Sequence, residues 1–411
     1  MILTFGALGS NWKRAMSYKA IYAYPWDVAE IGVTAAVDRF LGLGLDTVTI
    51  TGSYHAGKFL RPHGKSGKVY FPEDGTIYFK PDLSRYGAIK PVENAMLSSG
   101  QDIVRELVGQ SRIATNVWLV LLHNTRLGLQ HPNSVVANAF GDCYIYNLCP
   151  SAPEARAYAI GLARDVTESY PVSGVSLETP GFLPYAHGYH HEFALNRPNR
   201  WLDSQLGLCF CAHCRAGAKS AGVRVEALKR QVEADVEAYF ASAVDFPADM
   251  AEAFWLADVR SDGDLRAYLD WRCSVVTSLV REIRESVRKD ATVAVIPSVA
   301  RPTGGAWYEG SDLPALAEAA GIIEACFYEP GAERIKADLF DVKRRLRGKG
   351  RLRGILRPAF PDLESKGEFL AAIRALGAGG VSGIAFYNWG HVRDANLDWI
   401  AEGLALLKSA A

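Results

Sequence analysis

The chain has 411 residues, of which 49% are hydrophobic and 22% charged, so it is long enough for two or three domains or for one large α/β barrel. The ordinary apolar fraction and the lack of low-complexity tracts exclude disorder as the dominant state. Lys and Arg total 45, as do Asp and Glu. This zero formal net charge argues against nucleic acid as a partner, because nucleic-acid-binding proteins usually carry a basic excess or stripe.

The N-terminal segment does not read as a targeting signal. It has no basic region, and its apolar stretch is broken by Gly6 and Gly9. No apolar run approaches the ~18 residues that a bilayer-spanning helix needs. The seven cysteines are odd in number and unevenly spaced, unlike those of a disulfide scaffold. We therefore expect a cytoplasmic protein with reduced thiols and no membrane partner.

A repeated unit runs along the chain: an amphipathic helix ends near a glycine, and a short apolar strand follows. The first example is the helix predicted at 28–41, which leads through Gly42 and Gly44 into the strand at 47–51. The strands are almost continuously apolar, as expected for strands that are covered on both faces. Eight strands are predicted in chain order, at 20–24, 47–51, 115–122, 173–177, 292–297, 322–328, 353–357 and 382–387.

Eight strand and helix alternations favour an α/β fold of the (β/α)8 barrel type, formed as a single domain over 1–411. A doubly wound open sheet is the alternative, but no G-x-G-x-x-G motif follows the early strands. Two connections are unusually long, 52–100 after strand two and about 179–260 after strand four, and we interpret both as insertions. Loops that follow barrel strands build the active-site face, so both insertions are expected there.

Polar and aromatic side chains follow nearly every predicted strand. Tryptophan and tyrosine stack on sugar faces, while histidine, arginine and asparagine hydrogen-bond hydroxyl groups, so this pattern favours a pocket for a polyhydroxylated ligand. The candidate substrate-binding residues are Trp26, Tyr54, His55, His123, Arg126, His190, His191, Arg301, Arg357, Tyr387 and Trp389.

Glu178 and Glu329 form the predicted catalytic pair. Each follows an apolar strand, where a carboxylate is costly unless it is solvated or paired. Glycosidic cleavage needs two carboxyl groups, one to protonate the leaving oxygen and one to act as nucleophile or base. The alternative is that each glutamate pairs with an arginine, such as Arg357 or Arg301, and only closes the barrel rim. Glu309, Asp27, Asp142 and Glu192 are the further candidates.

The stretch 187–192 places three histidines and a glutamate within six residues. Together with His55, His123 and Glu178 it could form a metal site of the His/carboxylate type. It contains no H-x-x-x-H pair, however, and histidines on a loop over a sugar pocket also serve as hydroxyl-binding groups. Ligand binding is therefore favoured over a catalytic metal and over ordinary loop packing.

Cys209, Cys211 and Cys214 crowd into six residues and could wrap one tetrahedral ion as a structural zinc site. The spacing lacks the second CxxC pair of a zinc ribbon. Packing of the thiols as small buried hydrophobic groups is therefore the preferred interpretation, with zinc as the alternative. The candidates for a fourth ligand are Cys143, Cys149 and His213.

These motifs together resemble the bacterial (β/α)8 glycoside hydrolase-like proteins, including the groups known as hypothetical glycosyl hydrolases. The resemblance covers about 20–390 and is carried by short motifs at the strand ends. Those motifs are His123-Asn-Thr-Arg126, Cys149-Pro150, Glu178, the 187–192 loop and the cysteine-rich stretch 208–215. It implies a carbohydrate-active barrel.

The resemblance also implies roles for the two glutamates. In the barrel clan that cleaves α-galactosides and α-glucosides, the nucleophile follows strand four and the acid/base follows strand six, which are the places of Glu178 and Glu329. That clan uses aspartates at both places. The larger clan of β-glycosidases fits less well, because it expects Asn-Glu after strand four and Glu after strand seven, where this chain has Leu177-Glu178 and Arg357.

The sequence thus predicts a glycoside hydrolase that cleaves a small soluble glycoside and requires no cofactor. One alternative is a metal-dependent sugar isomerase, epimerase or lyase on the same barrel, and another is a non-catalytic sugar-binding barrel. A small carbohydrate is the expected partner. The sequence does not decide whether the chain forms a homo-oligomer.

Overall fold

The computed structural model describes residues 16, 18–189 and 195–409 and contains a closed barrel of eight parallel strands. Each strand pairs in parallel with the next, and β1 pairs with both β2 and β14, which closes the ring. The (β/α)8 barrel predicted from the sequence is confirmed. The barrel strands are β1 (Lys19–Ala23), β2 (Thr47–Tyr54), β7 (Ala114–Val120), β10 (Gly174–Glu178), β11 (Thr292–Val295), β12 (Gly321–Cys326), β13 (Arg351–Leu356) and β14 (Gly383–Phe386).

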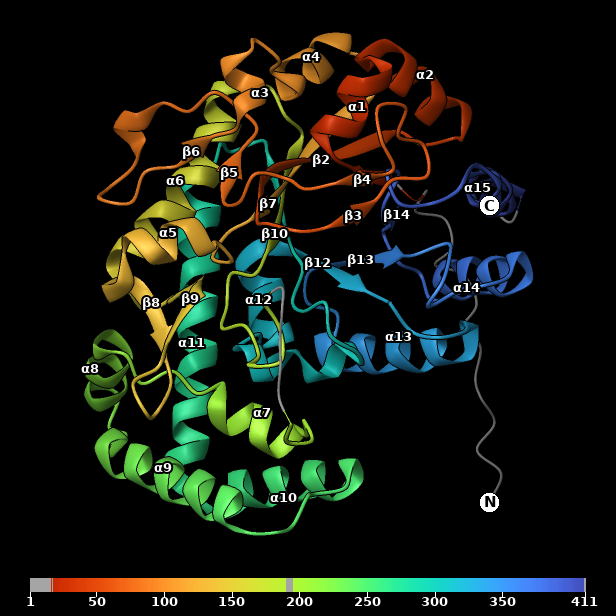
Figure 1. Cartoon of the computed structure of the whole chain (residues 1–411). Coiled ribbons are helices and arrows are strands. Elements are labelled where there is room, and N and C mark those ends of the chain that lie inside the picture. The colour runs from red at the N-terminus through yellow and green to blue at the C-terminus, as the bar shows by residue number, and fades with distance from the viewer. Residues whose placement is uncertain (1–15, 17, 190–194, 410–411) are drawn as a thin grey trace, which may run out of the picture.

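Helices follow the strands and surround the barrel (Figure 1). Their apolar faces pack on the strands to form the main hydrophobic core, as expected when a sheet is covered on its outer face. These helices are α1 (Pro25–Ile31), α2 (Val33–Gly42), α4 (Ile103–Gln110), α5 (Thr125–Gln130), α6 (Pro153–Ser169), α11 (Gly263–Ser286), α12 (Leu313–Ala320), α13 (Ala332–Leu346), α14 (Lys366–Ala378) and α15 (Asp394–Ser409).

Three connections after strands carry further elements. The connection after β2 contains β3 (Phe59–Leu60), β4 (Val69–Tyr70), β5 (Thr76–Ile77), β6 (Val92–Glu93) and α3 (Ala95–Ser98). The one after β7 contains the hairpin β8 (Val135–Ala137) and β9 (Cys143–Leu148), and the one after β10 contains α7 (Arg200–Leu206), α8 (Ala212–Ser220), α9 (Val225–Ala241) and α10 (Ala248–Ser261). A short 3-10 helix, η3 (Thr303–Glu309), follows β11. Within the described residues no helix is both long and apolar enough to cross a membrane.

The third barrel strand is shorter than the sequence predicts. Strand 115–122 is expected, whereas β7 ends at Val120. Leu121 and Leu122 stay fully buried, but the carbonyl oxygen of Leu122 accepts a hydrogen bond from the backbone of Leu148 in β9, at 2.9 Å. The β8–β9 hairpin covers Leu121 and Leu122, so the apolar sequence continues for two residues beyond the end of β7.

A second, smaller hydrophobic core joins α7, α9 and α10 to the first half of α11. Trp201 of α7, Trp255 of α10 and Tyr268 of α11 are buried in it, together with the apolar stripe of α9. Figure 1 shows these green helices as a layer at one end of the molecule, with α11 running from this layer along the barrel. This layer fixes the position of α7, whose side chains reach the cavity described below.

The barrel interior is filled by a polar layer below its open end. Asn116 donates a hydrogen bond to Ser176 at 3.0 Å, and Ser176 donates one to the carboxylate of Glu324 at 2.6 Å. The guanidinium of Arg353 lies 3.6 Å from the ring centre of Tyr18. These side chains come from several strands around the ring and fill the lower part of the barrel.

Candidate active site

A cavity of about 270 Å³ opens at the carboxyl ends of β10 and β11. This is the end of a (β/α)8 barrel where the loops after the strands meet. The α7 helix forms part of the wall, so the cavity lies between the barrel and the helical layer. It is lined by Glu178, Thr179, Leu183, Pro184, Ala186, His187, Arg200, Asp203, Ile296, Ser298, Val299, Ala300 and Glu309.

Glu178 is the last residue of β10, and its side chain lines this cavity. The indole Nε1 of Trp118 donates a hydrogen bond to its carboxylate at 2.6 Å. Burial raises the pKa of Glu178 to about 7, and the Trp118 hydrogen bond, which stabilises the charged form, opposes that rise. Thr179, the next residue, has φ of 51°, a left-handed conformation that is strained for a β-branched residue.

Glu309 ends η3 and lines the same cavity with only 8% of its surface exposed. Ser298, three residues after β11, donates its hydroxyl hydrogen to the Glu309 carboxylate at 2.5 Å. Burial is the main cause that raises the pKa of Glu309 to about 7, and the negative charges of Asp203 and Glu178 raise it further. The two glutamates are therefore close enough for one charge to disfavour the other.

Arg200 and Asp203 extend from α7 into the cavity wall. Their charged groups lie 3.2 Å apart, and Arg200 also lies over the ring of Tyr308, with 4.6 Å between its guanidinium carbon and the ring centre. Glu252 of α10 approaches the Nε of Arg200 to 3.4 Å. The wall of the cavity thus carries a fixed cation and a third carboxylate, neither of which the strand-end pattern in the sequence predicts.

The structure does not place Glu329 in this cavity, which corrects its predicted pairing with Glu178. Glu329 is 1% exposed, and its carboxylate accepts a hydrogen bond from the Nε of Arg334 in α13 at 2.7 Å. The sequence shows that a residue follows a strand, but the direction of its side chain depends on the path of the loop. The alternative of an ion pair therefore describes Glu329, although its partner is Arg334 and not Arg357 or Arg301.

The other side of the barrel mouth is filled with aromatic rings. We call Tyr24, Trp26, Tyr54, Phe59 and Trp118 the aromatic half, since they pack on one another at the ends of β1, β2 and β7. Tyr24 donates its hydroxyl hydrogen to Tyr54 at 3.1 Å, and the ring of Trp26 stacks on Tyr24 with centres 4.4 Å apart. Trp26 is therefore largely covered by other rings and does not line the cavity.

Two of the predicted tyrosines lie next to the cavity without lining it. Tyr54 and Tyr387 both have a pKa raised mainly by burial, and the Glu178 charge contributes to the rise in each. The hydroxyl of Tyr387 lies 2.9 Å from that of Tyr24. Trp389, by contrast, is 2% exposed and meets Phe40 of α2 edge-on at 5.3 Å, so it belongs to the hydrophobic core and its predicted role in sugar binding is corrected.

The predicted histidines stack beside the cavity. The rings of His55 and His123 lie parallel with centres 3.9 Å apart, and His123 Nε2 lies 3.0 Å from the carbonyl oxygen of Gly188. His187 approaches His123 edge-on and lines the cavity. His190, His191 and Glu192 lie outside the described residues.

The predicted arginines are held by carboxylates outside the cavity. Arg126 pairs with Glu73 at 3.1 Å. Arg357 donates two hydrogen bonds to Asp362, at 2.5 and 2.8 Å, and Arg301 donates one to the carbonyl oxygen of Tyr328. Arg301 also pairs with Asp362 at 3.4 Å, and none of the three arginines lines the cavity.

Two of the further candidate carboxylates also lie elsewhere. Asp27 pairs with Arg61 at 2.6 Å, and its pKa is raised to about 6, mainly by burial. Asp142 accepts a hydrogen bond from Asn138 at 3.0 Å. Of the further candidates within the described residues, only Glu309 lines the cavity.

The described parts of the chain contain one group of at least three His, Cys, Asp or Glu residues with the spacing of a metal site, and it is a cysteine cluster outside the cavity. It consists of the predicted Cys209, Cys211 and Cys214, joined by Cys149. The histidines and carboxylates that line the cavity do not form such a group. The predicted metal set also includes His190 and His191, which lie outside the described residues, so the metal-dependent alternative stays a prediction.

No family model matches the chain, and no curated protein matches it in sequence. Among solved structures, it is similar to the PgaB (BpsB) glycoside hydrolase domain from Bordetella bronchiseptica. The TM-score is 0.54, with 14% identity over 95% of this chain and 98% of that one. It is also similar to α-L-fucosidase isoenzyme 2 from Paenibacillus thiaminolyticus, with a TM-score of 0.53 and 11% identity over 95% of this chain and 49% of that one.

The chain thus spans about half the length of the fucosidase and nearly all of the PgaB domain. Both similar proteins are glycoside hydrolases, so the resemblance that the sequence indicates is confirmed at the level of the fold. The class that emerges is a (β/α)8 barrel with the fold of glycoside hydrolases.

Proposed function

We propose that the protein is a glycoside hydrolase with Glu178 and Glu309 as its catalytic carboxyl pair. The observation that carries this proposal is that two enclosed glutamates from different elements line one cavity and each has a pKa raised to about 7. Glycosidases need one carboxylic acid and one carboxylate on either side of the scissile bond. The fold shared with glycoside hydrolases supports the same class of reaction.

The surroundings distinguish the roles of the two glutamates. Each glutamate accepts one hydrogen bond that favours its carboxylate form, from Ser298 for Glu309 and from Trp118 for Glu178, so the difference lies in the neighbouring charges. The negative charges of Asp203 and Glu178 favour the protonated form of Glu309, against the opposing charge of Arg200, while no negative charge is among the causes that raise the pKa of Glu178. Glu309 is therefore the general acid that gives its proton to the glycosidic oxygen as the bond to the anomeric carbon breaks. Glu178 is the carboxylate that attacks that carbon or takes a proton from the attacking water.

The cavity suits a small substrate. Its volume of about 270 Å³ is just below the ~300–1,000 Å³ typical of small-molecule sites. Arg200, His187 and Ser298 offer hydrogen bonds to hydroxyl groups, while Leu183 and Ile296 offer apolar contacts. We therefore propose that it holds one sugar unit of a small glycoside, with the aromatic half limiting access of water to Glu178.

The test is a screen of aryl glycosides with leaving groups of differing acidity, using the wild-type chain and the variants Glu178→Gln, Glu309→Gln and Glu329→Gln. Glu178→Gln should lower kcat/KM by about 10²–10⁴-fold on every substrate. Glu309→Gln should lose as much on poor leaving groups but much less on acidic ones, which need no proton. Glu329→Gln is the matched control and should stay within a few fold of the wild type.

Equal losses in all three variants would contradict the assignment of the pair. A wild-type chain that binds sugars in calorimetry but turns over no glycoside in the screen would instead identify a sugar-binding barrel.

A further inference from the structure

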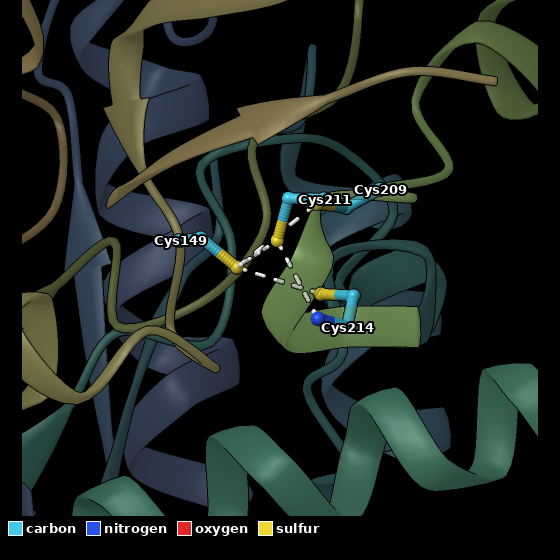
Figure 2. Close-up of side chains that lie close together, drawn as sticks. All are labelled: Cys149, Cys209, Cys211 and Cys214. Carbon is cyan, nitrogen blue, oxygen red and sulfur yellow. Dashed lines mark hydrogen bonds between the residues drawn. The ribbon is translucent and has the colours of Figure 1, made fainter. Parts of the chain in front are cut away.

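Four cysteines from two parts of the chain converge at one point outside the cavity. Cys149 follows β9, Cys209 and Cys211 lie between α7 and α8, and Cys214 lies in the first turn of α8. Figure 2 shows their four side chains pointing toward one another. Their sulfur atoms all lie within 4.8 Å of each other.

The spacing of the sulfur atoms matches that around a single tetrahedral ion. Cys149 Sγ lies 3.4 Å from that of Cys214, 3.6 Å from that of Cys211 and 4.0 Å from that of Cys209. In a tetrahedral zinc site with Zn–S bonds of about 2.3 Å, the sulfur atoms are about 3.8 Å apart. An iron–sulfur cluster would place several atoms between the sulfurs and could not keep all four within this distance.

The surroundings of the four thiols suit a closed structural site. Cys149, Cys209 and Cys214 are fully buried, and Cys211 is 8% exposed, so no coordination position faces solvent. The backbone N–H of Cys214 donates to the sulfur of Cys211, which caps the N-terminus of α8, where the helix dipole favours a thiolate. Tyr268 of α11 donates its hydroxyl hydrogen to the carbonyl oxygen of Cys209, and such outer contacts hold ligands in place.

Simple packing of small side chains does not account for this arrangement. Packing requires only that each thiol be covered by apolar neighbours, and it gives no reason for the sulfur atoms of two segments some sixty residues apart to meet at one point. Cysteine sulfurs in a closed set of four are the ligand set of structural zinc sites.

We infer that Cys149, Cys209, Cys211 and Cys214 bind one structural zinc ion that fastens the connection after β7 to the connection after β10. The ion holds the segment just after α7 against the end of the β8–β9 hairpin. Because Arg200 and Asp203 of α7 line the cavity, the zinc site also fixes that wall of the cavity. The inference rests on the cysteine geometry alone and stands independently of the proposed hydrolase activity.

The first measurement is the metal content of the full-length wild-type chain, purified under reducing conditions. We expect about one zinc per chain, with X-ray absorption showing four sulfur neighbours at about 2.3 Å. The cobalt-substituted protein should show the strong visible absorption of a tetrahedral thiolate site. Since no variant is involved, this result does not depend on whether a mutant folds.

The variant Cys149→Ser should lose at least nine-tenths of the bound zinc, whereas Cys143→Ser, on the same hairpin, should keep all of it. Cys143 is the matched control because it is exposed and outside the cluster. Removing zinc with a chelator should speed amide hydrogen exchange in 200–214 by at least tenfold and leave that in α14 unchanged.

Three results would overturn the inference: a wild-type chain that takes up no zinc even when zinc is added, iron accompanied by acid-labile sulfide, or fewer than seven free thiols after denaturation without reductant. The last would reveal a disulfide in place of a metal site.

Discussion

The carboxylates in the two halves of the barrel mouth differ in their bonding partners and in whether they line a cavity. On the side of β10 and β11, Glu178 and Glu309 line an open cavity, and each accepts a hydrogen bond from a neutral donor, Trp118 or Ser298. On the side of β1 and β2, rings fill the mouth, and Asp27 pairs with the guanidinium of Arg61. Among the described residues, neither cavity glutamate is hydrogen-bonded to an arginine, and the pKa of each is raised to about 7, so both can hold or release a proton near neutral pH. The carboxylate of Asp27, bonded to Arg61, instead serves to hold the structure together.

The Arg61 ion pairs also explain how the aromatic half is closed. Arg61 follows β3, its side chain is 6% exposed, and it bonds to both Asp27 at 2.6 Å and Glu30 at 2.5 Å. Both acids belong to α1, so the ion pairs fasten the connection after β2 over the barrel. A buried carboxylate destabilises the folded chain when its cation is removed. Loss of Arg61 is therefore expected to have the largest effect on stability.

Arg61→Met should lower the free energy of unfolding by about 3–5 kcal/mol, because it leaves the buried Asp27 without its cation. The control is Arg39→Met, which removes the exposed pair of Arg39 with Asp394 and should cost no more than about 1 kcal/mol. Urea denaturation measures both. Equal losses would show that the Asp27 pair is no more important than a surface contact.

The contribution of Glu309 to the free energy of unfolding should fall as the pH rises. A carboxylate that is stabilised by a cation contributes in the opposite sense. The pKa of Glu309 is about 7 in the folded chain against an ordinary value of 4.5, so folding favours its protonated form. Its contribution to stability is therefore largest below about pH 4.5 and declines until about pH 7. Glu309→Gln, which cannot ionise, should gain stability relative to the wild type by on the order of 3 kcal/mol between pH 4 and pH 8.

The control for this pH series is Glu333→Gln at an exposed position, where the side chain is 84% exposed. Its stability difference from the wild type should vary little with pH. A Glu309→Gln curve that runs parallel to the wild-type curve would show that Glu309 titrates normally and would remove its assignment as the acid.

Ser298→Ala should move the pH profile of kcat/KM without abolishing activity. The Ser298 hydroxyl stabilises the charged form of Glu309, so its loss should raise the pKa of Glu309 and shift the alkaline limb upward by about one pH unit. The exposed Ser274→Ala is the control and should leave both limbs in place. A purely structural role for Ser298 would lower activity at every pH without moving the limb.

The smallest effect concerns the backbone beside Glu178. Thr179 has φ of 51°, which glycine adopts without strain, so Thr179→Gly should raise stability by up to about 1 kcal/mol. Arg347 at the end of α13 has the same φ, and Arg347→Gly should give a similar gain far from the cavity. Only Thr179→Gly should also lower kcat, because the strained residue fixes the direction of Glu178; unchanged kcat would show that it does not.

The sequence predicts which residues follow the barrel strands, but it does not predict which way their side chains point. Glu178 follows an apolar strand and was placed correctly at the barrel mouth, since strand ends are readable from the pattern. Glu329 satisfies the same rule, yet its carboxylate bonds to Arg334 of α13 and does not line the cavity. Glu309 lies in a 3-10 helix eleven residues beyond Ser298, and only its position in the Trp-Tyr-Glu segment after strand five made it a candidate.

The cysteine cluster likewise has a part that the sequence predicts and a part that only the structure shows. Three members stand within six residues and are visible in the sequence, while Cys149 was one of three candidates for the fourth place. The structure selects Cys149, which follows the end of β9 and is buried within 4.8 Å of the other three sulfur atoms, over Cys143, which begins β9 and is exposed.

The sequence by itself determined the barrel, because the alternation of amphipathic helices with buried strands is a local property that survives without knowledge of contacts. Only the tertiary structure decided which strand-end residues share a cavity, which carboxylates are neutralised by arginine and which thiols meet. Those outcomes depend on the path of the loops and the direction of each side chain, and both are set by packing between segments far apart in the chain.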